Sequence, residues 1–277
     1  RGMSGTRPAE WLARESDGVT LEKAIATVGG AVHRAAQRDD IKAFLELHIE
    51  QGPVLQNEQR DVGVVTAIAG ITRIEVVVEG RADHAGTTPM GARKDALTTA
   101  AWIALGVEEL ARALASGDEH FAATVGEFEM MPNAANVVPA RVRMLIDARA
   151  ELRADMDRFL DELGKGIAAI AEKTGVAVGE PRIVSDNPPT PCDPDLLEIL
   201  DAACDSAGAR HRRMASGAGH DTAWMARITK AAMIFVPCRD GRSHAPDELA
   251  TTEDIALGTA VLLDAVRALD MKLQEKS

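Results

Sequence analysis

Residues 80–95, GRADHAGTTPMGARKD, decide how this chain is organised. An apolar run at 74–78 leads into the stretch, and a helical pattern from residue 93 to about 115 follows it. Between them lie one histidine, two threonines, one proline and three glycines. A shaped strand-to-helix loop is a usual place for a functional side chain on a rigid scaffold. The alternative is a Gly/Pro turn that carries an incidental surface histidine.

The pattern around this stretch predicts a β-α-β-β-α-β unit. Ile74, Val76 and Val78 alternate with glutamates, which indicates a strand with one solvated face. Apolar residues spaced by three and four from Leu152 onward indicate an amphipathic helix. Further strands are predicted at 122–128, 138–147 and 176–184. This order is the split βαβ, ferredoxin-like arrangement, and we place the unit at 72–183.

The rest of the chain predicts an α/β layer. A Pro-rich linker at 186–191 is followed by a helix at 195–206, a buried strand at 231–236 and a last helix at 252–273. Residues 1–71 and 184–277 would then form one domain, interrupted by the 72–183 unit. The predicted fold class is therefore α/β with two domains.

Composition limits the classes of partner. The 277 residues are 46% hydrophobic and 27% charged, as in soluble globular proteins. The net charge of −12 argues against a nucleic-acid partner. No apolar run reaches the roughly 18 residues that a membrane span needs, and no secretory signal opens the chain. The three scattered cysteines have no paired spacing, so we expect a reducing, cytoplasmic setting.

Several segments together resemble the carbamoylase and allantoate amidohydrolase branch of the metal-dependent M20 amidohydrolases. They occur in the family's order: LHIEQGP at 47–53, residues 80–95, residues 132–149, SGAGHD at 216–221 and SHAPDE at 243–248. The resemblance implies a metallohydrolase domain interrupted by a ferredoxin-like lid at 72–183, through which the protein would form a homodimer. The family's N-terminal portion, with its other metal ligands and its catalytic glutamate pair, has no counterpart here.

His48 and His244 are the candidate metal ligands. Imidazole suits zinc, manganese, cobalt or nickel, and histidines from distant loops can converge on one ion. From the residues alone, a hydrogen-bonded structural histidine is the commoner role; the resemblance implies ligands, with two ions in the complete enzyme. Glu50 or Asp247 could orient a ligand, or could be exposed loop carboxylates.

The resemblance implies that His84 stabilises the oxyanion and contributes to substrate binding. It also implies substrate binding by Gln51, Asn136, Arg149 and Gly219. A guanidinium can hold a carboxylate with two parallel N–H groups, side-chain amides can pair with a ureido group, and a glycine allows close backbone approach. Taken alone, the same residues could be a capping Gln, a turn Asn and a surface Arg.

The implied reaction is hydrolysis of a ureido C–N bond in an N-carbamoyl-L-amino acid or an allantoate-like substrate, by metal-activated water. The alternatives are an M20 peptidase or aminoacylase, and a non-enzymatic binding or dimerisation module. Because two histidines rarely hold a catalytic ion alone, we expect the chain as given to bind metal weakly and to be inactive. The ureido substrate, the metal and the stereoisomer stay open.

Overall fold

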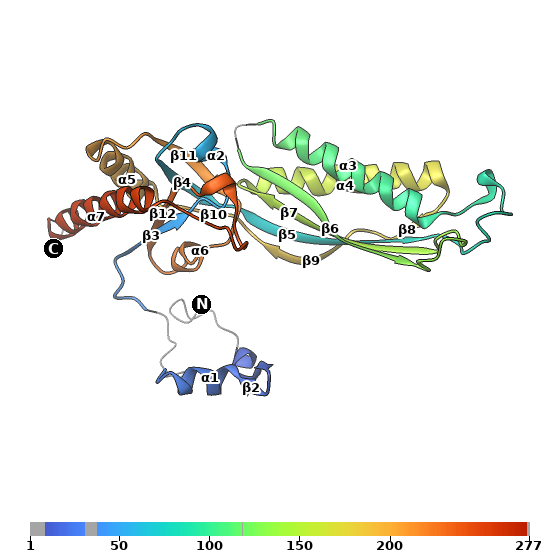
Figure 1. The fold of residues 1–277 in the computed structure, drawn as a ribbon, viewed down its shortest axis with the longest axis horizontal. Helices are drawn as coiled ribbons and strands as arrows, with labels where there is room; N and C mark the ends of the chain where they lie inside the picture. Colours follow the sequence, from blue (N-terminus) through green and yellow to red (C-terminus); the bar gives the residue numbers. More distant parts are fainter. Residues whose placement is uncertain (1–8, 31–37, 118, 276–277) are drawn as a thin grey trace. The chain divides into compact units, whose positions relative to one another are not determined.

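The computed structural model describes residues 9–30, 38–117 and 119–275, which divide into two compact units (Figure 1). Unit 1 contains residues 1–66, 191–214 and 219–277, and unit 2 contains residues 67–190 and 215–218. Sequence patterning places the junctions at 71/72 and 183/184, and that assignment stays a prediction. No helix among the described residues is long and apolar enough to cross a membrane.

Unit 2 is an antiparallel sheet with two helices, and it has the predicted β-α-β-β-α-β order. Its sheet runs β6-β7-β5, with β8 and β9 pairing along the other edge of β5. The helices α3 and α4 pack against each other and both contact β7. The bounds are β5 Gly70–Glu79, α3 Ala96–Leu114, β6 Phe121–Met131, β7 Arg141–Ala150, α4 Arg153–Thr174, β8 Ala177–Val178 and β9 Arg182–Asn187.

The alternation along β5 and β7 separates an apolar core from a charged face. Successive strand residues point to opposite faces of a sheet, and the inward ones are fully buried against α3 and α4. These buried strand residues are Ile74, Val76, Val78, Val142, Met144 and Ile146. Their burial is the main stabilising term for this unit, since apolar area removed from water contributes about 25 cal/mol per Å².

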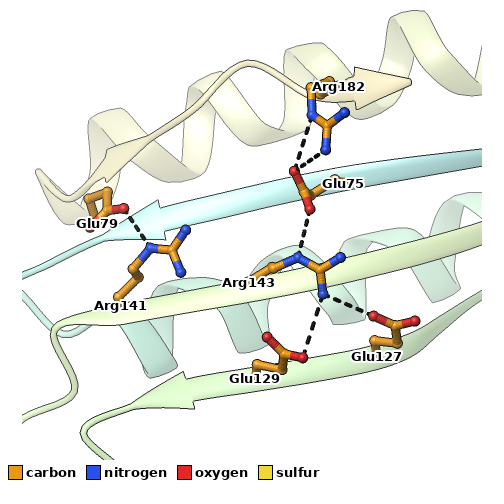
Figure 2. A network of polar contacts seen from close by, with 7 residues as sticks. All are labelled: Glu75, Glu79, Glu127, Glu129, Arg141, Arg143 and Arg182. Atoms are coloured by element: carbon orange, nitrogen blue, oxygen red, sulfur yellow. Dashed lines mark hydrogen bonds and ion pairs between the residues drawn. The ribbon is translucent and has the colours of Figure 1, made fainter. Parts of the chain in front are cut away.

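The opposite face of the sheet carries a network of ion pairs, drawn in Figure 2 with the helices behind the strands. Glu75 on β5 accepts from Arg143 Nε at 2.6 Å and from Arg182 Nη2 at 2.7 Å. Arg143 also pairs with Glu127 and Glu129 on β6. Exposed pairs of this kind contribute only about 0–1 kcal/mol each. The network therefore keeps this face polar, while the core on the other face determines stability.

Unit 1 contains a mixed sheet in the order β10-β4-β12-β3, with β11 also pairing with β4. Strand β12 is parallel to β3 and antiparallel to β4, and six of its seven residues are buried. Helices α5 and α7 pack together, and both contact β12. The bounds are β3 Ala43–Ile49, α2 Val54–Asn57, β4 Val62–Ile68, β10 Thr190–Pro191, α5 Pro194–Ser206, β11 His211–Ser216, α6 Thr222–Met225, β12 Lys230–Val236 and α7 Thr252–Gln274.

The remaining elements of unit 1 are short. Before β3 come η1 Ala9–Ala13, β1 Glu15–Ser16, β2 Val19–Thr20 and α1 Leu21–Thr27. Thr20 caps α1, because its side chain accepts the N–H of Lys23. Thr251 caps α7, because its side chain accepts the N–H of Asp254 at 3.1 Å.

The parallel pair β3 and β12 determines which loops of unit 1 meet. His48 lies opposite Phe235 in the register, and the N–H of Glu50 donates to the carbonyl of Val236. The residues that follow β3 therefore leave the sheet at the same edge as those that follow β12. In α/β sheets, ligands bind outside the carboxyl ends of the strands.

Candidate functional site

The tautomer of His48 is fixed by a backbone hydrogen bond, as is usual for a histidine that binds a metal ion. It is the next-to-last residue of β3, and its Nδ1 lies 2.9 Å from the carbonyl oxygen of Ile49. Because a carbonyl oxygen can only accept, Nδ1 carries the proton and the lone pair of the neutral ring is on Nε2. A ligating histidine usually donates its other N–H in this way, which fixes tautomer and ring orientation.

The buried ring of His220 packs against the ring of His48. Its ring stands edge-on to the His48 ring with centroids 4.7 Å apart, and it packs on Phe235 at 5.5 Å. Burial, with a smaller effect of His48, lowers the pKa of His220 to about 4, so the ring is neutral at neutral pH. Its Nδ1 lies 4.0 Å from Glu46, which accepts the N–H and the hydroxyl of Thr222. His220 is therefore a buried packing residue beside the site.

Glu50 is buried, so it is not an exposed loop carboxylate. It is 7% exposed, and its two oxygens accept the N–H groups of Val54 at 2.7 Å and Leu55 at 2.8 Å. These are unpaired donors of the first turn of α2, so the carboxylate caps that helix. Burial raises the pKa of Glu50. Asp247 is exposed and pairs with Arg242 at 2.6 Å.

A side-chain hydrogen bond joins the loops after β3 and β12, since Gln51 Nε2 donates to Ser243 Oγ at 2.8 Å. Within the second loop, the backbone N–H of His244 donates to Glu248 Oε2 at 2.8 Å. The bond from the His244 N–H is the largest of the effects that lower the pKa of Glu248. Glu248 therefore binds the backbone of a candidate ligand, and the motif-based choice of residues had passed over it.

His84 and Asn136 lie together in unit 2. His84 forms an isolated bridge with Val137, and the N–H of Ala85 donates to the carbonyl of Asn136 at 3.0 Å. The Gly86 N–H donates to His84 Nδ1 at 3.1 Å, so the neutral ring carries its proton on Nε2. His84 is exposed, so this N–H can serve as a donor to a ligand.

Arg93 holds the 80–95 loop, a role that sequence reasoning missed. Its Nη2 donates to the carbonyl of Ala85 at 2.5 Å, and its Nε donates to the carbonyl of Thr88 at 3.1 Å. Both bonds end on the segment that follows His84. A long side chain that returns to its own loop leaves no local pattern, so only the structure reveals it.

Arg149 is held by two partners within unit 2. Its Nε donates to Asp147 Oδ1 and its Nη1 donates to the carbonyl of Gly217, both at 2.7 Å. Two of the five N–H groups of the guanidinium are therefore already in use. Gly219 is exposed, and a β-carbon added to it would meet no atom within 4 Å. Protein packing therefore does not require glycine at this position.

His120 lies against Gly217 and is not a fully exposed surface residue. A β-carbon added to Gly217 would come within 2.8 Å of His120 Nε2, so the ring fills the space beside that glycine. Burial lowers the pKa of His120, against an opposing effect of Glu151. The folded state therefore favours the neutral ring.

We expect His120 to make the free energy of unfolding decrease as the pH is lowered. A histidine whose folded pKa lies below its unfolded value of about 6.5 contributes fully above that pH and less below it. Urea unfolding of the wild type and of His120→Gln at pH 7.5, 6.5 and 5.5 measures this. The wild type should lose more unfolding free energy than the variant between pH 7.5 and 5.5. A difference between the two proteins that does not change with pH would contradict the prediction.

The candidate donors at the β3–β12 edge are imidazoles, which are common ligands of divalent metal ions. His48 lies at the end of β3 and His244 in the loop after β12, and the His48 tautomer leaves Nε2 available. Among residues 9–30, 38–117 and 119–275, however, no group of three or more His, Cys, Asp or Glu side chains could hold an ion. The described residues therefore offer two candidate donors at this edge, His48 and His244.

Comparisons with known proteins agree with these motifs. The family model described as "Peptidase family M20/M25/M40" matches residues 13–268. The chain is 37% identical over 273 residues to the N-carbamoyl-L-amino-acid amidohydrolase of Paenarthrobacter aurescens, covering 97% of this chain and 65% of that protein. It is 36% identical over 262 residues to the allantoate amidohydrolase of Bacillus subtilis, covering 92% of this chain and 62% of that protein.

The fold of this chain is also similar to that of a solved structure. The amidase of the hydantoinase/carbamoylase family from Burkholderia multivorans superimposes with a TM-score of 0.85 at 34% identity. The match covers 95% of this chain and 64% of that one. The two-domain α/β fold expected from the sequence is therefore confirmed. The chain spans just under two thirds of the length of each of these three proteins.

Proposed function

Since this chain belongs to peptidase family M20/M25/M40, we propose that it carries part of the active site of a metal-dependent amidohydrolase. The bond cleaved is a ureido C–N bond, in an N-carbamoyl-L-amino acid or an allantoate-like molecule. Members of this family generally depend on divalent metal ions. The observation that supports the proposal most directly is the His48 tautomer, which leaves Nε2 available at the carboxyl edge of two parallel strands.

His48 and His244 would hold the metal in this proposal. A divalent ion supplies Lewis acidity and lowers the pKa of bound water, and attack on a poorly electrophilic ureido carbonyl requires both. Zinc, manganese, cobalt and nickel all accept imidazole, and the complete enzyme would use two ions.

The remaining residues would bind the substrate and stabilise the negative charge that develops on its carbonyl oxygen. His84, with its proton on Nε2, would donate to the carbonyl oxygen as that oxygen gains charge. Arg149 would hold the substrate carboxylate, and Gln51 and Asn136 would pair with amide groups of the substrate. Gly219, where an added side chain would meet open space, would let the backbone approach the substrate.

The experiment is an ammonia-release assay on the whole encoded protein, with each of the four metals. Substrates are N-carbamoyl-L-amino acids, their D-isomers, allantoate and simple dipeptides. Metal-dependent ammonia release from a ureido compound would support the proposal. Turnover of dipeptides alone would establish a peptidase or aminoacylase instead. Binding of ureido compounds without turnover would establish a binding module.

Assembly and location belong to the same proposal. We propose a homodimer formed through the 72–183 domain and a cytoplasmic location. Light scattering of the purified protein measures the mass in solution, and a monomer at micromolar concentration would overturn the first statement. Fractionation of the source cells tests the second.

We expect His84→Ala to lower kcat by about 100-fold, because loss of one oxyanion donor costs on the order of 10²–10³ in kcat. KM should change little, since the bond strengthens only as charge develops. Steady-state kinetics on the best ureido substrate measures both constants. Met90→Ala is the matched control, an exposed residue of the same loop that should leave kcat unchanged. A His84→Ala enzyme with wild-type kcat would remove His84 from the mechanism.

A further inference from the structure

Two residues near the candidate metal site have left-handed backbone conformations without being glycine. Gln51 has a φ of 59° and His244 has a φ of 56°. Side chains with a β-carbon rarely adopt this region, and such conformations persist where neighbouring groups hold them. One lies in the loop after β3 and the other in the loop after β12. What holds them therefore determines where the His244 ring is placed.

Hydrogen bonds hold both of these residues. Gln51 Nε2 donates at 2.8 Å to the Oγ of Ser243, the residue before His244. The backbone N–H of His244 donates to Glu248 Oε2 at 2.8 Å. Hydrogen bonds to an ionised carboxylate are stronger than those between neutral groups. Glu248 therefore binds the backbone of His244 directly, and Gln51 is bonded to the residue next to it.

Other roles for Glu248 are less well supported by its surroundings. It does not cap α7, because Thr251 performs that role. The neighbouring carboxylate, Asp247, pairs with Arg242 and does not bind this backbone N–H. Glu248 is exposed, so apolar packing does not explain its position either. What remains is its hydrogen bond to the backbone of His244.

We propose that Glu248 is a positioning residue, whose carboxylate fixes the backbone of His244 in the loop that the Gln51–Ser243 hydrogen bond ties to the loop after β3. The imidazole of His244 is thereby held at the same sheet edge as that of His48. The inference rests on the proposed function in one respect, the role of His244 as a metal ligand.

The hydrogen bond itself can be tested without metal. In Glu248→Ala, the backbone amide of His244 should exchange with solvent about tenfold faster than in the wild type, since a bond to a charged acceptor is lost. Nitrogen–proton correlation spectra of the metal-free protein measure this. Asp247→Ala is the matched control, a carboxylate one residue away that does not bind this amide. Unchanged exchange in Glu248→Ala would overturn the proposal.

The positioning role is tested by zinc affinity in the whole encoded protein. Calorimetry should show zinc binding about 10–100-fold weaker in Glu248→Ala, the range for loss of a group that orients a ligand. Glu248→Gln, which keeps an acceptor oxygen, should restore part of the affinity. The cobalt-substituted protein should show a changed visible absorption band in Glu248→Ala and an unchanged band in Asp247→Ala. Equal thermal unfolding midpoints of the wild type and Glu248→Ala would exclude general unfolding as the cause of weaker zinc binding.

A double-mutant cycle separates this proposal from the proposed function. If Glu248 acts through His244, then Glu248→Ala should weaken zinc binding no further in a His244→Ala background. An additive loss in that background would overturn the positioning role. If His244→Ala leaves zinc affinity unchanged while Glu248→Ala still accelerates exchange of the amide, Glu248 positions this loop and the ligand assignment in the proposed function is wrong.

Discussion

Replacing His48 with alanine is expected to abolish metal-dependent turnover and to weaken zinc binding by more than about 100-fold. Loss of a group that only orients a ligand costs about 10–100-fold, and loss of the ligand itself should cost more. The ring is positioned by its bond to Ile49 and by the edge-on contact with His220. Calorimetry with zinc and the ammonia-release assay on the whole encoded protein measure the two effects.

The control for His48 is another partly buried histidine of unit 1. His211 is 20% exposed at its side chain, and its Nε2 lies 3.3 Å from Asp201, outside the candidate site. His211→Ala should leave zinc affinity and turnover unchanged. His48→Gln provides a second variant of similar size if alanine disturbs the packing of His220. Wild-type zinc affinity in both His48 variants would remove this residue from the metal site.

Replacing Phe159 with alanine is expected to lower the free energy of unfolding of unit 2 by about 3–5 kcal/mol, the range for large aromatic truncations in a packed core. Phe159 on α4 is completely buried, and its ring centroid lies 5.2 Å from that of Phe121 on β6. The variant therefore loses buried area and leaves a cavity between helix and sheet. Denaturant unfolding followed by circular dichroism measures the loss.

Phe128 is the matched control in the same sheet. It is also on β6 but is 41% exposed, so Phe128→Ala should change the unfolding free energy by no more than about 0.5 kcal/mol. A loss below about 1 kcal/mol in Phe159→Ala would show that the core can collapse around the smaller side chain. Equal losses in both variants would contradict the assignment of the apolar face as the core.

The elements that sequence reasoning identified are those with strong local signals. The alternation at Ile74, Val76 and Val78 became β5, and the apolar spacing from Leu152 onward became α4. Thr20 and Thr251 cap helices, and each cap joins residues only three positions apart. These patterns are short in range, so they can be read without knowing the fold.

The elements that were missed depend on distant partners. Strand β3 has a mixed pattern, AFLELHI, and it is a strand because it pairs with β12 along its whole length. Strand β11, HRRMAS, is largely polar and pairs with β4, while Arg213 bonds to Asp201 on α5. Neither pairing leaves a periodic signal in the strand itself.

The sequence by itself determined the family motifs, the order of elements in unit 2 and the identity of the candidate residues. Only the tertiary structure decided the tautomers of His48 and His84, the role of Glu50 as a helix cap, and the hydrogen bond from the His244 N–H to Glu248. The physical reason is loop conformation. Periodicity and N-caps follow from residue types at fixed spacings, whereas these contacts, although short in sequence, form only in the particular conformations that the loops adopt once their strands are paired.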